Sequence, residues 1–158
     1  MASEGTVTDF EGLSWHDDTI YGLRFDVGDS FQGDWHADLV LDIDHIVAWV
    51  RGEAGKFQFR VAPATLVFHG VTDLKVAIDW GDSGDCTALH DLSIAEITRE
   101  PVPDQEGYPV REHYRWRIAL NWPQGGEIAF GARGFTQTLR AEPVLLDEQR
   151  LPAGTRGT

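Results

Sequence analysis

The sequence lacks the features of a membrane protein or of a secreted, disulfide-bonded protein. Its only cysteine is Cys86, so no intrachain disulfide can form. No apolar run approaches the ~18 residues that a membrane-spanning helix requires. The first residues, MASEGTVTDFEG, have neither the basic region nor the apolar region of a secretion signal. These absences predict a cytoplasmic protein, because disulfides are rare in that compartment.

Basic residues are also scarce. Thirteen lysines and arginines, only two of them lysines, stand against 26 aspartates and glutamates, and the formal net charge is −13. A negative field repels nucleic-acid phosphates and anionic lipids, so we expect neither nucleic acid nor a membrane as partner. The same field would attract a basic protein partner or a cation, although acidity also serves solubility alone.

The dominant pattern is an alternation of apolar and polar residues with a period of two, which is typical of half-buried strands. In the first such run, Tyr21, Leu23, Phe25 and Val27 share one face. A loop rich in Gly and Asp separates this run from a second alternating run over 35–43. Two alternating runs joined by such a loop predict a β-hairpin.

Similar runs continue along the chain and predict the fold class. Ala62-Pro63-Ala64 should separate the runs on either side, because proline cannot donate to a strand ladder. Residues 92–99 fit either a strand or a short helix. We therefore expect an all-β antiparallel sandwich or a curled, partly open barrel of about seven to nine strands, with at most one short helix. Residues 1–151 would form this one domain, and 152–158 a disordered tail. The later runs are 57–61, 65–69, 74–80, 114–122 and 128–130.

His16, Asp17 and Asp18 stand directly before the first run. Together with His36 they are candidate ligands for a metal or a small molecule. The histidine–aspartate pair at His16 and Asp17 resembles the metal dyad of HD phosphohydrolases. That chemistry needs further histidines and an aspartate on helices, and no helical histidine partner follows in this sequence. The alternative is structural, since aspartates bond nearby backbone amides and start turns.

The polar face of the predicted hairpin offers a second candidate site. If paired residue numbers sum to about 62, Arg24 lies opposite Asp38 and Asp26 lies opposite His36, which are complementary pairs if His36 is protonated. Such a face could receive the basic residues of a partner, or it could be only a solvated surface. The residues that we assign to partner binding are Asp38, Asp42, Asp44, Trp35 and Trp49.

Other site chemistries have less support. The loop Asp79–Asp85 spaces its aspartates three apart, whereas an EF-hand needs them two apart, so only a loose calcium site stays open there. Cys86 and His90 lack the second pair of ligands that structural zinc needs. The sequence has no G-x-S-x-G elbow and no phosphate-binding loop. We therefore assign no catalytic residue, no metal centre and no cofactor, and we leave enzymatic activity open.

Two short motifs carry a family resemblance. The first is His16-Asp17-Asp18-Thr19-Ile20 with Leu23-Arg24-Phe25-Asp26, and the second is Phe68-His69-Gly70-Val71-Thr72-Asp73-Leu74. Together they resemble small bacterial β-rich proteins of unknown function, a group that includes some immunity proteins of polymorphic toxin systems. The resemblance covers about a sixth of the chain. It implies a compact cytosolic β-protein that binds another protein.

Three functional hypotheses follow. The first is an acidic protein that binds a basic protein partner through its sheet surface, as an immunity protein binds a toxin. The second is a small-molecule-binding protein or enzyme, with a pocket inside the curled sheet where His36, Asp38, Arg115 and Arg117 converge. The third is a homodimer joined through edge strands.

Overall fold

A computed structural model describes residues 6–81, 88–103 and 113–156 of the chain, without the side chains of Thr6 and Val7. Ten strands form one antiparallel sheet, and the described residues contain four single-turn 3-10 helices and no α-helix. The predicted all-β, curled fold is confirmed. Residues 92–99 belong to a strand. The strands are β1 Thr6–Val7, β2 Thr19–Val27, β3 Ala37–Arg51, β4 Phe57–His69, β5 Thr72–Ala77, β6 Leu92–Pro101, β7 Tyr114–Trp122, β8 Glu127–Ala132, β9 Gly134–Leu139 and β10 Val144–Leu146.

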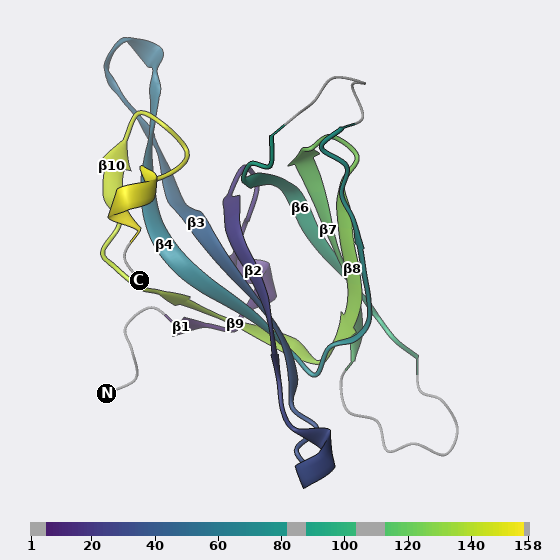
Figure 1. Ribbon diagram of the computed structural model, residues 1–158. Coiled ribbons are helices and arrows are strands. Elements are labelled where there is room, and N and C mark those ends of the chain that lie inside the picture. The colour runs from purple at the N-terminus through teal and green to yellow at the C-terminus, as the bar shows by residue number, and fades with distance from the viewer. Residues whose placement is uncertain (1–5, 82–87, 104–112, 157–158) are drawn as a thin grey trace.

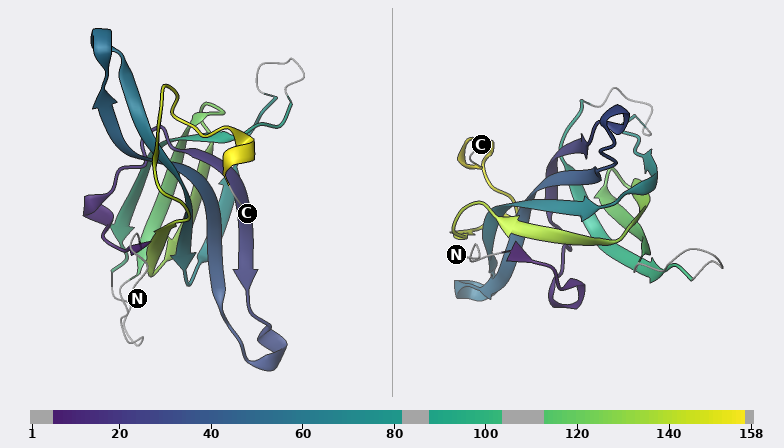
Figure 2. Two further views of the ribbon diagram at one scale, coloured as in Figure 1. Left: turned by 90° about the vertical axis from the view of Figure 1, so that its left-hand side faces the viewer. Right: turned by 90° about the horizontal axis from the view of Figure 1, so that it is seen from below.

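The sheet curls so that its two halves face each other. The strand order is β1-β9-β4-β3-β2-β6-β7-β8-β5, with β10 on the outer part of β4, and the two ends of this order do not pair in the described chain. Figures 1 and 2 show β3, β4 and β9 on one side and β6, β7 and β8 on the other, with β2 between them. None of the helices in the described residues is long and apolar enough to cross a bilayer.

The space between the two halves is the hydrophobic core. Trp116 of β7 packs edge-on against Phe68 of β4 and Phe135 of β9, with ring centroids 5.0 and 5.9 Å apart. A buried tryptophan of this kind contributes about 3–5 kcal/mol to stability. The core also takes apolar residues from β3, β6 and β8, namely Leu39, Leu41, Ile43, Ile94, Ile97, Ile128 and Phe130.

Pro63 does not interrupt the fourth strand, contrary to the sequence prediction. β4 is continuous, and Pro63 pairs with Asp44 of β3. The Pro63 carbonyl accepts from the Arg140 backbone on the side away from β3, and in an antiparallel strand the nitrogen of the same residue points the same way. On that side β10 pairs with β4 only as far as Val61, and the pairing of β9 with β4 begins at Ala64. The missing N–H therefore falls at a gap between two partner strands, where the ladder needs no donor.

The predicted register of the first hairpin is wrong by two residues, because paired residue numbers sum to 64 and not to 62. Asp26 pairs with Asp38, and Arg24 pairs with Val40. A slip of two residues keeps each side chain on its face, so the alternation alone could not detect it. A bulge between Ile20 and Gly22 also takes Tyr21 out of the face predicted for it, and its ring lies beneath the guanidinium groups of two arginines.

The C-terminal segment packs against the outer face of the sheet. Leu151 is buried in a small second core with Ile46 and Val61 on the outer face of β3 and β4. Residues 153–155 form a 3-10 turn, and Arg156 bonds to the buried carboxylate of Asp44. Residues 151–156 thus cover apolar and charged groups of β3, while a disordered tail from residue 152 stays a prediction.

Candidate functional site

The hairpin formed by β2 and β3 projects from the body of the sheet, at the bottom of Figure 1. Its outer part carries four large apolar side chains that are mostly exposed. Phe31 is 97% exposed and Trp35 is 79% exposed, while Phe25 and Val27 on β2 are 61% and 66% exposed. We refer to these four residues as the hairpin tip. Large apolar groups gathered in this way on one projection are typical of a binding surface.

Short polar residues give the loop its shape and hold Phe31 outward. Asp29 caps the 3-10 turn Ser30–Gln32, because its Oδ1 accepts from the Phe31 backbone at 3.0 Å. Gly33 ends the turn at φ 79°, a conformation that favours glycine. Asp34 Oδ1 then accepts from the His36 backbone at 3.0 Å. These local bonds form a defined loop, so the aromatic residues are presented on ordered backbone.

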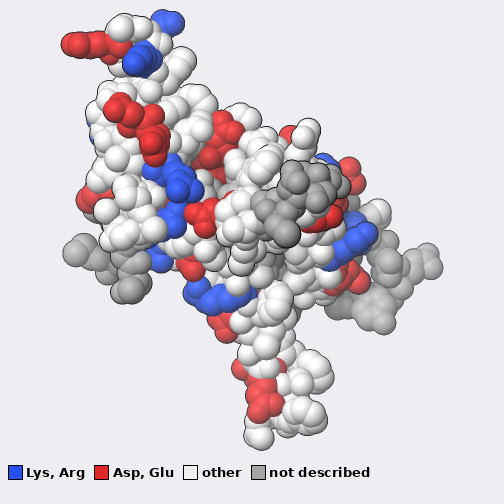
Figure 3. All heavy atoms as spheres, turned by 45° about the horizontal axis from the view of Figure 1, so that its top comes forward, with Lys and Arg blue, Asp and Glu red and all other residues white. Residues whose placement is uncertain are grey.

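The hairpin is acidic. Residues 25–38 contain four aspartates and no lysine or arginine, a formal charge of −4. In Figure 3 the projection at the bottom shows acidic and uncharged atoms and no basic ones. The surface therefore combines exposed apolar side chains with negative charge.

The β2 strand of this hairpin has one sparsely paired edge. Within the described residues it pairs with β6 only at Thr19 and Ile20, whereas its pairing with β3 runs to Val27. A surface pocket of about 400 Å³ lies beside this edge, lined by residues 20–23 of β2 and by Trp80 and residues 89–92. An edge of this kind offers backbone groups to an added strand.

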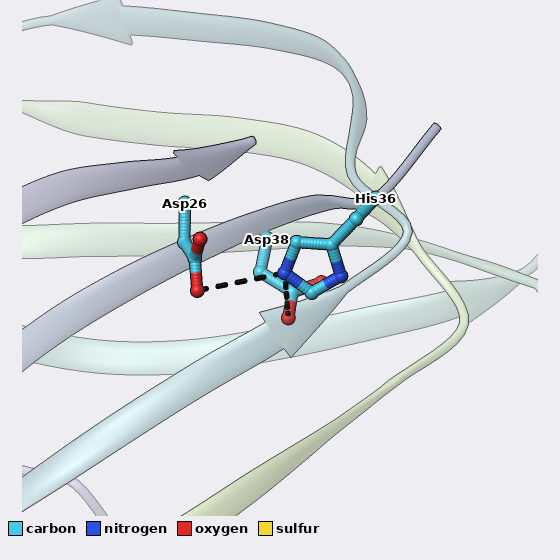
Figure 4. Close-up of side chains that lie close together, drawn as sticks. All are labelled: Asp26, His36 and Asp38. Carbon is cyan, nitrogen blue, oxygen red and sulfur yellow. Dashed lines mark ion pairs between the residues drawn. The ribbon is translucent and has the colours of Figure 1, made fainter. Parts of the chain in front are cut away.

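A second feature lies on the same hairpin, where its two strands enter the loop. Asp26 of β2, His36 of the loop and Asp38 of β3 bring one ligand atom each to within 4.8 Å of one another. Figure 4 shows one nitrogen of the His36 ring directed toward both carboxylates. His36 Nε2 lies 3.5 Å from Asp26 Oδ2 and 3.3 Å from Asp38 Oδ2. We refer to these three residues as the histidine–carboxylate cluster.

Asp38 is the fixed member of this cluster. It is only 8% exposed, and its Oδ2 accepts from His69 Nδ1 at 3.1 Å. A carboxylate can only accept, so the proton of neutral His69 is on Nδ1, and Nε2 is free to accept from the Thr136 hydroxyl at 3.1 Å. The Gly70 backbone N–H lies 3.4 Å from Asp38 Oδ1. Asp26 and His36 are exposed and can adjust to this fixed group.

The other two predicted acidic residues of β3 do not belong to an open surface. Asp44 is completely buried, and Arg156 binds its two carboxylate oxygens through Nε and Nη2, the shortest contact being 2.8 Å. Asp42 lies 3.2 Å from Arg24 Nη1 and 3.7 Å from Arg140 Nη1. We refer to Asp42, Asp44, Arg24, Arg140 and Arg156 as the arginine-paired cluster. Arginines of the chain itself pair with these carboxylates, and a role of Asp42 and Asp44 in partner binding stays a prediction.

His16, Asp17 and Asp18 do not form a common ligand set. His16 Nδ1 bonds to the Ala95 carbonyl at 2.9 Å. The Asp17 carboxylate accepts from Asn121 and Gln149, which ties β7 and the C-terminal segment to this turn. The contacts of His16 and Asp17 therefore fit the alternative in which these residues have a structural role.

Asp18 is buried away from its two neighbours. Its Oδ2 lies 2.6 Å from His45 Nδ1, and its Oδ1 accepts from the Ile46 backbone at 2.9 Å. Burial raises the pKa of the Asp18 carboxyl above its ordinary value of 3.8, and the hydrogen bond with His45 opposes that rise. Asp18 therefore joins the turn before β2 to β3 and has no exposed oxygen for a ligand.

Trp49, the second predicted aromatic contact, lies on the other hairpin, formed by β3 and β4. Its ring packs against Phe57 and Phe59, with centroids 6.0 and 4.9 Å apart. The two hairpins extend from opposite ends of the molecule (Figure 2), so Trp35 and Trp49 do not share a surface.

His36, Asp38, Arg115 and Arg117 do not converge inside the sheet, contrary to the arrangement predicted for an interior pocket. Both arginines lie on the exposed face of β7, and Arg117 Nε pairs with Glu127 at 2.8 Å. The space between the sheet halves is filled by the apolar core. Residues 82–85 of the candidate calcium loop, and Cys86, lie outside the described residues.

Neither the exposure of Phe31 nor the pairing of Asp26 with Asp38 is predicted above from the sequence. Phe31 stands alone in the polar loop GDSFQGD, and an aromatic residue with no alternating neighbours was a readable signal. The contact between Asp38 and His69 joins residues 31 apart in the sequence, and no local pattern predicts it.

Comparison of the chain with protein-family models, with curated proteins and with solved structures found no match.

Proposed function

We propose that this protein binds a basic protein partner, and that the hairpin tip is the docking surface. The observation that carries the proposal is the combination of four exposed apolar side chains with four aspartates on one projecting hairpin that has no lysine or arginine. The resemblance to immunity proteins supports the same kind of function, a cytoplasmic protein whose partner is another protein.

The apolar residues would supply the affinity. Among the described residues no ring contact involves Phe31 or Trp35, whereas Trp49 on the other hairpin packs against two phenylalanines. Burial of a large aromatic side chain removes roughly 150–250 Å² from water and dominates interface energetics. Central aromatic residues of this type are the usual hot spots of protein interfaces.

The charge would select the partner and speed its arrival. Four aspartates within 14 residues create a local negative potential, which attracts lysines and arginines and repels acidic proteins. Screening by salt weakens such attraction. The sparsely paired edge of β2 favours a partner that presents an extended segment, because a strand added there would continue the sheet beside Leu23, Phe25 and Val27.

The test compares two double variants in affinity capture from the source cell at low and high salt. Phe31→Ser with Trp35→Ser removes the apolar groups of the hairpin tip, and Trp49→Ser with Phe57→Ser is the matched control on the other hairpin. We expect wild type and control to recover the same lysine- and arginine-rich protein, and the tip variant to lose it. With that partner purified, the tip variant should bind at least about 30-fold more weakly, which corresponds to one hot spot of 2 kcal/mol.

Several results would contradict the proposal. They are recovery of the same partner by the tip variant, equal recovery at low and high salt, an acidic partner, or no partner that depends on the tip. Light scattering of the purified chain separates a further outcome, in which the tip binds a second copy of this protein. Thermal unfolding should show the tip variant within about 0.5 kcal/mol of wild type, since these side chains are exposed.

A further inference from the structure

We infer that the histidine–carboxylate cluster of Asp26, His36 and Asp38 is a binding site for a divalent transition-metal ion of the Zn²⁺ class. The inference concerns a different ligand from the docking proposal, although Asp26 and Asp38 are also two of the four aspartates counted there.

The first reason is the distance between the ligand atoms. His36 Nε2 lies 3.3 and 3.5 Å from the two carboxylate oxygens, longer than the about 2.7–2.9 Å of a charge-assisted N–H···O bond. Two ligands bound tetrahedrally to zinc at about 2.0–2.1 Å lie roughly 3.3–3.4 Å apart. The spacing around His36 therefore fits a shared ion better than a shared proton.

The second reason is the register of the two strands. Asp26 and Asp38 are direct cross-strand partners, and like charges in that position destabilise a sheet. In the described part of the chain, the ion pairs of these two carboxylates are with His36 and His69, and none is with a lysine or arginine. A divalent cation balances the two carboxylate charges and removes this repulsion.

The third reason is the support around Asp38. His69 and the Gly70 backbone both donate to its carboxylate, and His69 is itself oriented by Thr136. Ligating carboxylates in metal sites are characteristically held by such outer hydrogen bonds. The buried Asp38 thus provides a preset ligand, and the exposed Asp26 and His36 can close on the ion from the other strand and the loop.

The ligand set indicates the class of ion. One imidazole with two carboxylates suits zinc and neighbouring first-row ions, whereas calcium and magnesium prefer oxygen ligands alone. Three protein ligands leave one tetrahedral position for water or for a donor group of another molecule. Because the ligands come from β2, the loop and β3, a bound ion would fasten the two strands of the hairpin together.

The test uses the full chain with Cys86→Ser, which removes the thiol as a competing ligand. Zinc chloride is titrated by calorimetry, and Co²⁺ is bound as a probe whose visible absorption reports tetrahedral coordination. We expect one ion per chain. His36→Ala and Asp26→Asn should each weaken binding at least about tenfold and abolish the cobalt bands. Both replaced side chains are exposed, so these variants should fold.

His16→Ala is the matched control, because His16 is also an exposed histidine beside an aspartate, with Nε2 3.5 Å from Asp17 Oδ2. This variant should bind zinc as wild type does. The inference is overturned if the Cys86→Ser protein binds neither zinc nor cobalt, if His36→Ala binds them unchanged, or if His16→Ala causes an equal loss.

Discussion

Two aspartates of one strand, β3, have opposite surroundings, Asp38 at its start and Asp44 in its middle. Asp44 is buried against Arg156, which belongs to a segment 112 positions later in the sequence. Asp38 faces a second aspartate across the hairpin, and the groups near it are two histidines. Where the chain supplies an arginine, the carboxylate holds the fold together. Where it supplies none, the carboxylates are left for a cation or a basic group from outside. The three predictions that follow compare these environments, from the largest expected effect to the smallest.

Removing the internal cation should cost the most. Arg156→Met leaves Asp44 buried without its charge partner, and breaking a buried pair in this way costs about 3–5 kcal/mol. Urea unfolding measures the loss. Arg150→Met is the matched control in the same segment, because Arg150 is exposed and 3.7 Å from Asp91, and a surface pair of this kind contributes at most about 1 kcal/mol. Equal losses in both variants would show that the Asp44 pair has no special role.

Asp18 adds a third kind of carboxylate, one that is buried with a histidine. Because burial raises its pKa in the folded protein, the folded state holds the proton at a pH where the unfolded chain has released it. This contribution to stability is complete below pH 3.8 and is lost as pH rises through the higher pKa of the folded state. Asp18→Asn should lack the dependence, so its stability relative to wild type should increase over that range, as measured by urea unfolding at several pH values.

Asp18→Asn keeps an oxygen to accept from the Ile46 backbone, so the variant should still fold, with a constant loss of about 1–3 kcal/mol for the weakened contact with His45. A difference between the two proteins that stays flat with pH would contradict the raised pKa.

Much of the fold could be predicted from the sequence, because in a half-buried strand every second residue faces the core and is apolar. Leu39, Leu41 and Ile43 are such a case, and all three are in the core. The alternation also placed Asp42 and Asp44 correctly on the opposite face. It could not show that this face is covered, since the cover comes from Leu151 and a distant arginine.

The candidate site was less predictable, because it too depends on contacts between residues that no local pattern connects. Pairing of Asp26 with Asp38 depends on the capped turn at Ser30–Gln32, which sets the loop length without changing the alternation. The aromatic residue Trp35 was assigned to partner binding, and it does lie exposed on the acidic hairpin. Whether it binds a partner stays a prediction. Residues that act together across strands become visible only when the register is known.

The most direct test of the contrast between the surroundings of Asp38 and Asp44 is the unfolding free energy of wild type and Asp26→Asn, each with and without zinc. Without the ion, Asp26→Asn should be more stable than wild type by about 0.2–1 kcal/mol, because a like-charge pair is removed. With free zinc at about 100 times the dissociation constant, wild type should gain roughly 2.7 kcal/mol and the order should reverse. A variant that is less stable without zinc, or a zinc effect of the same size in both proteins, would contradict the account.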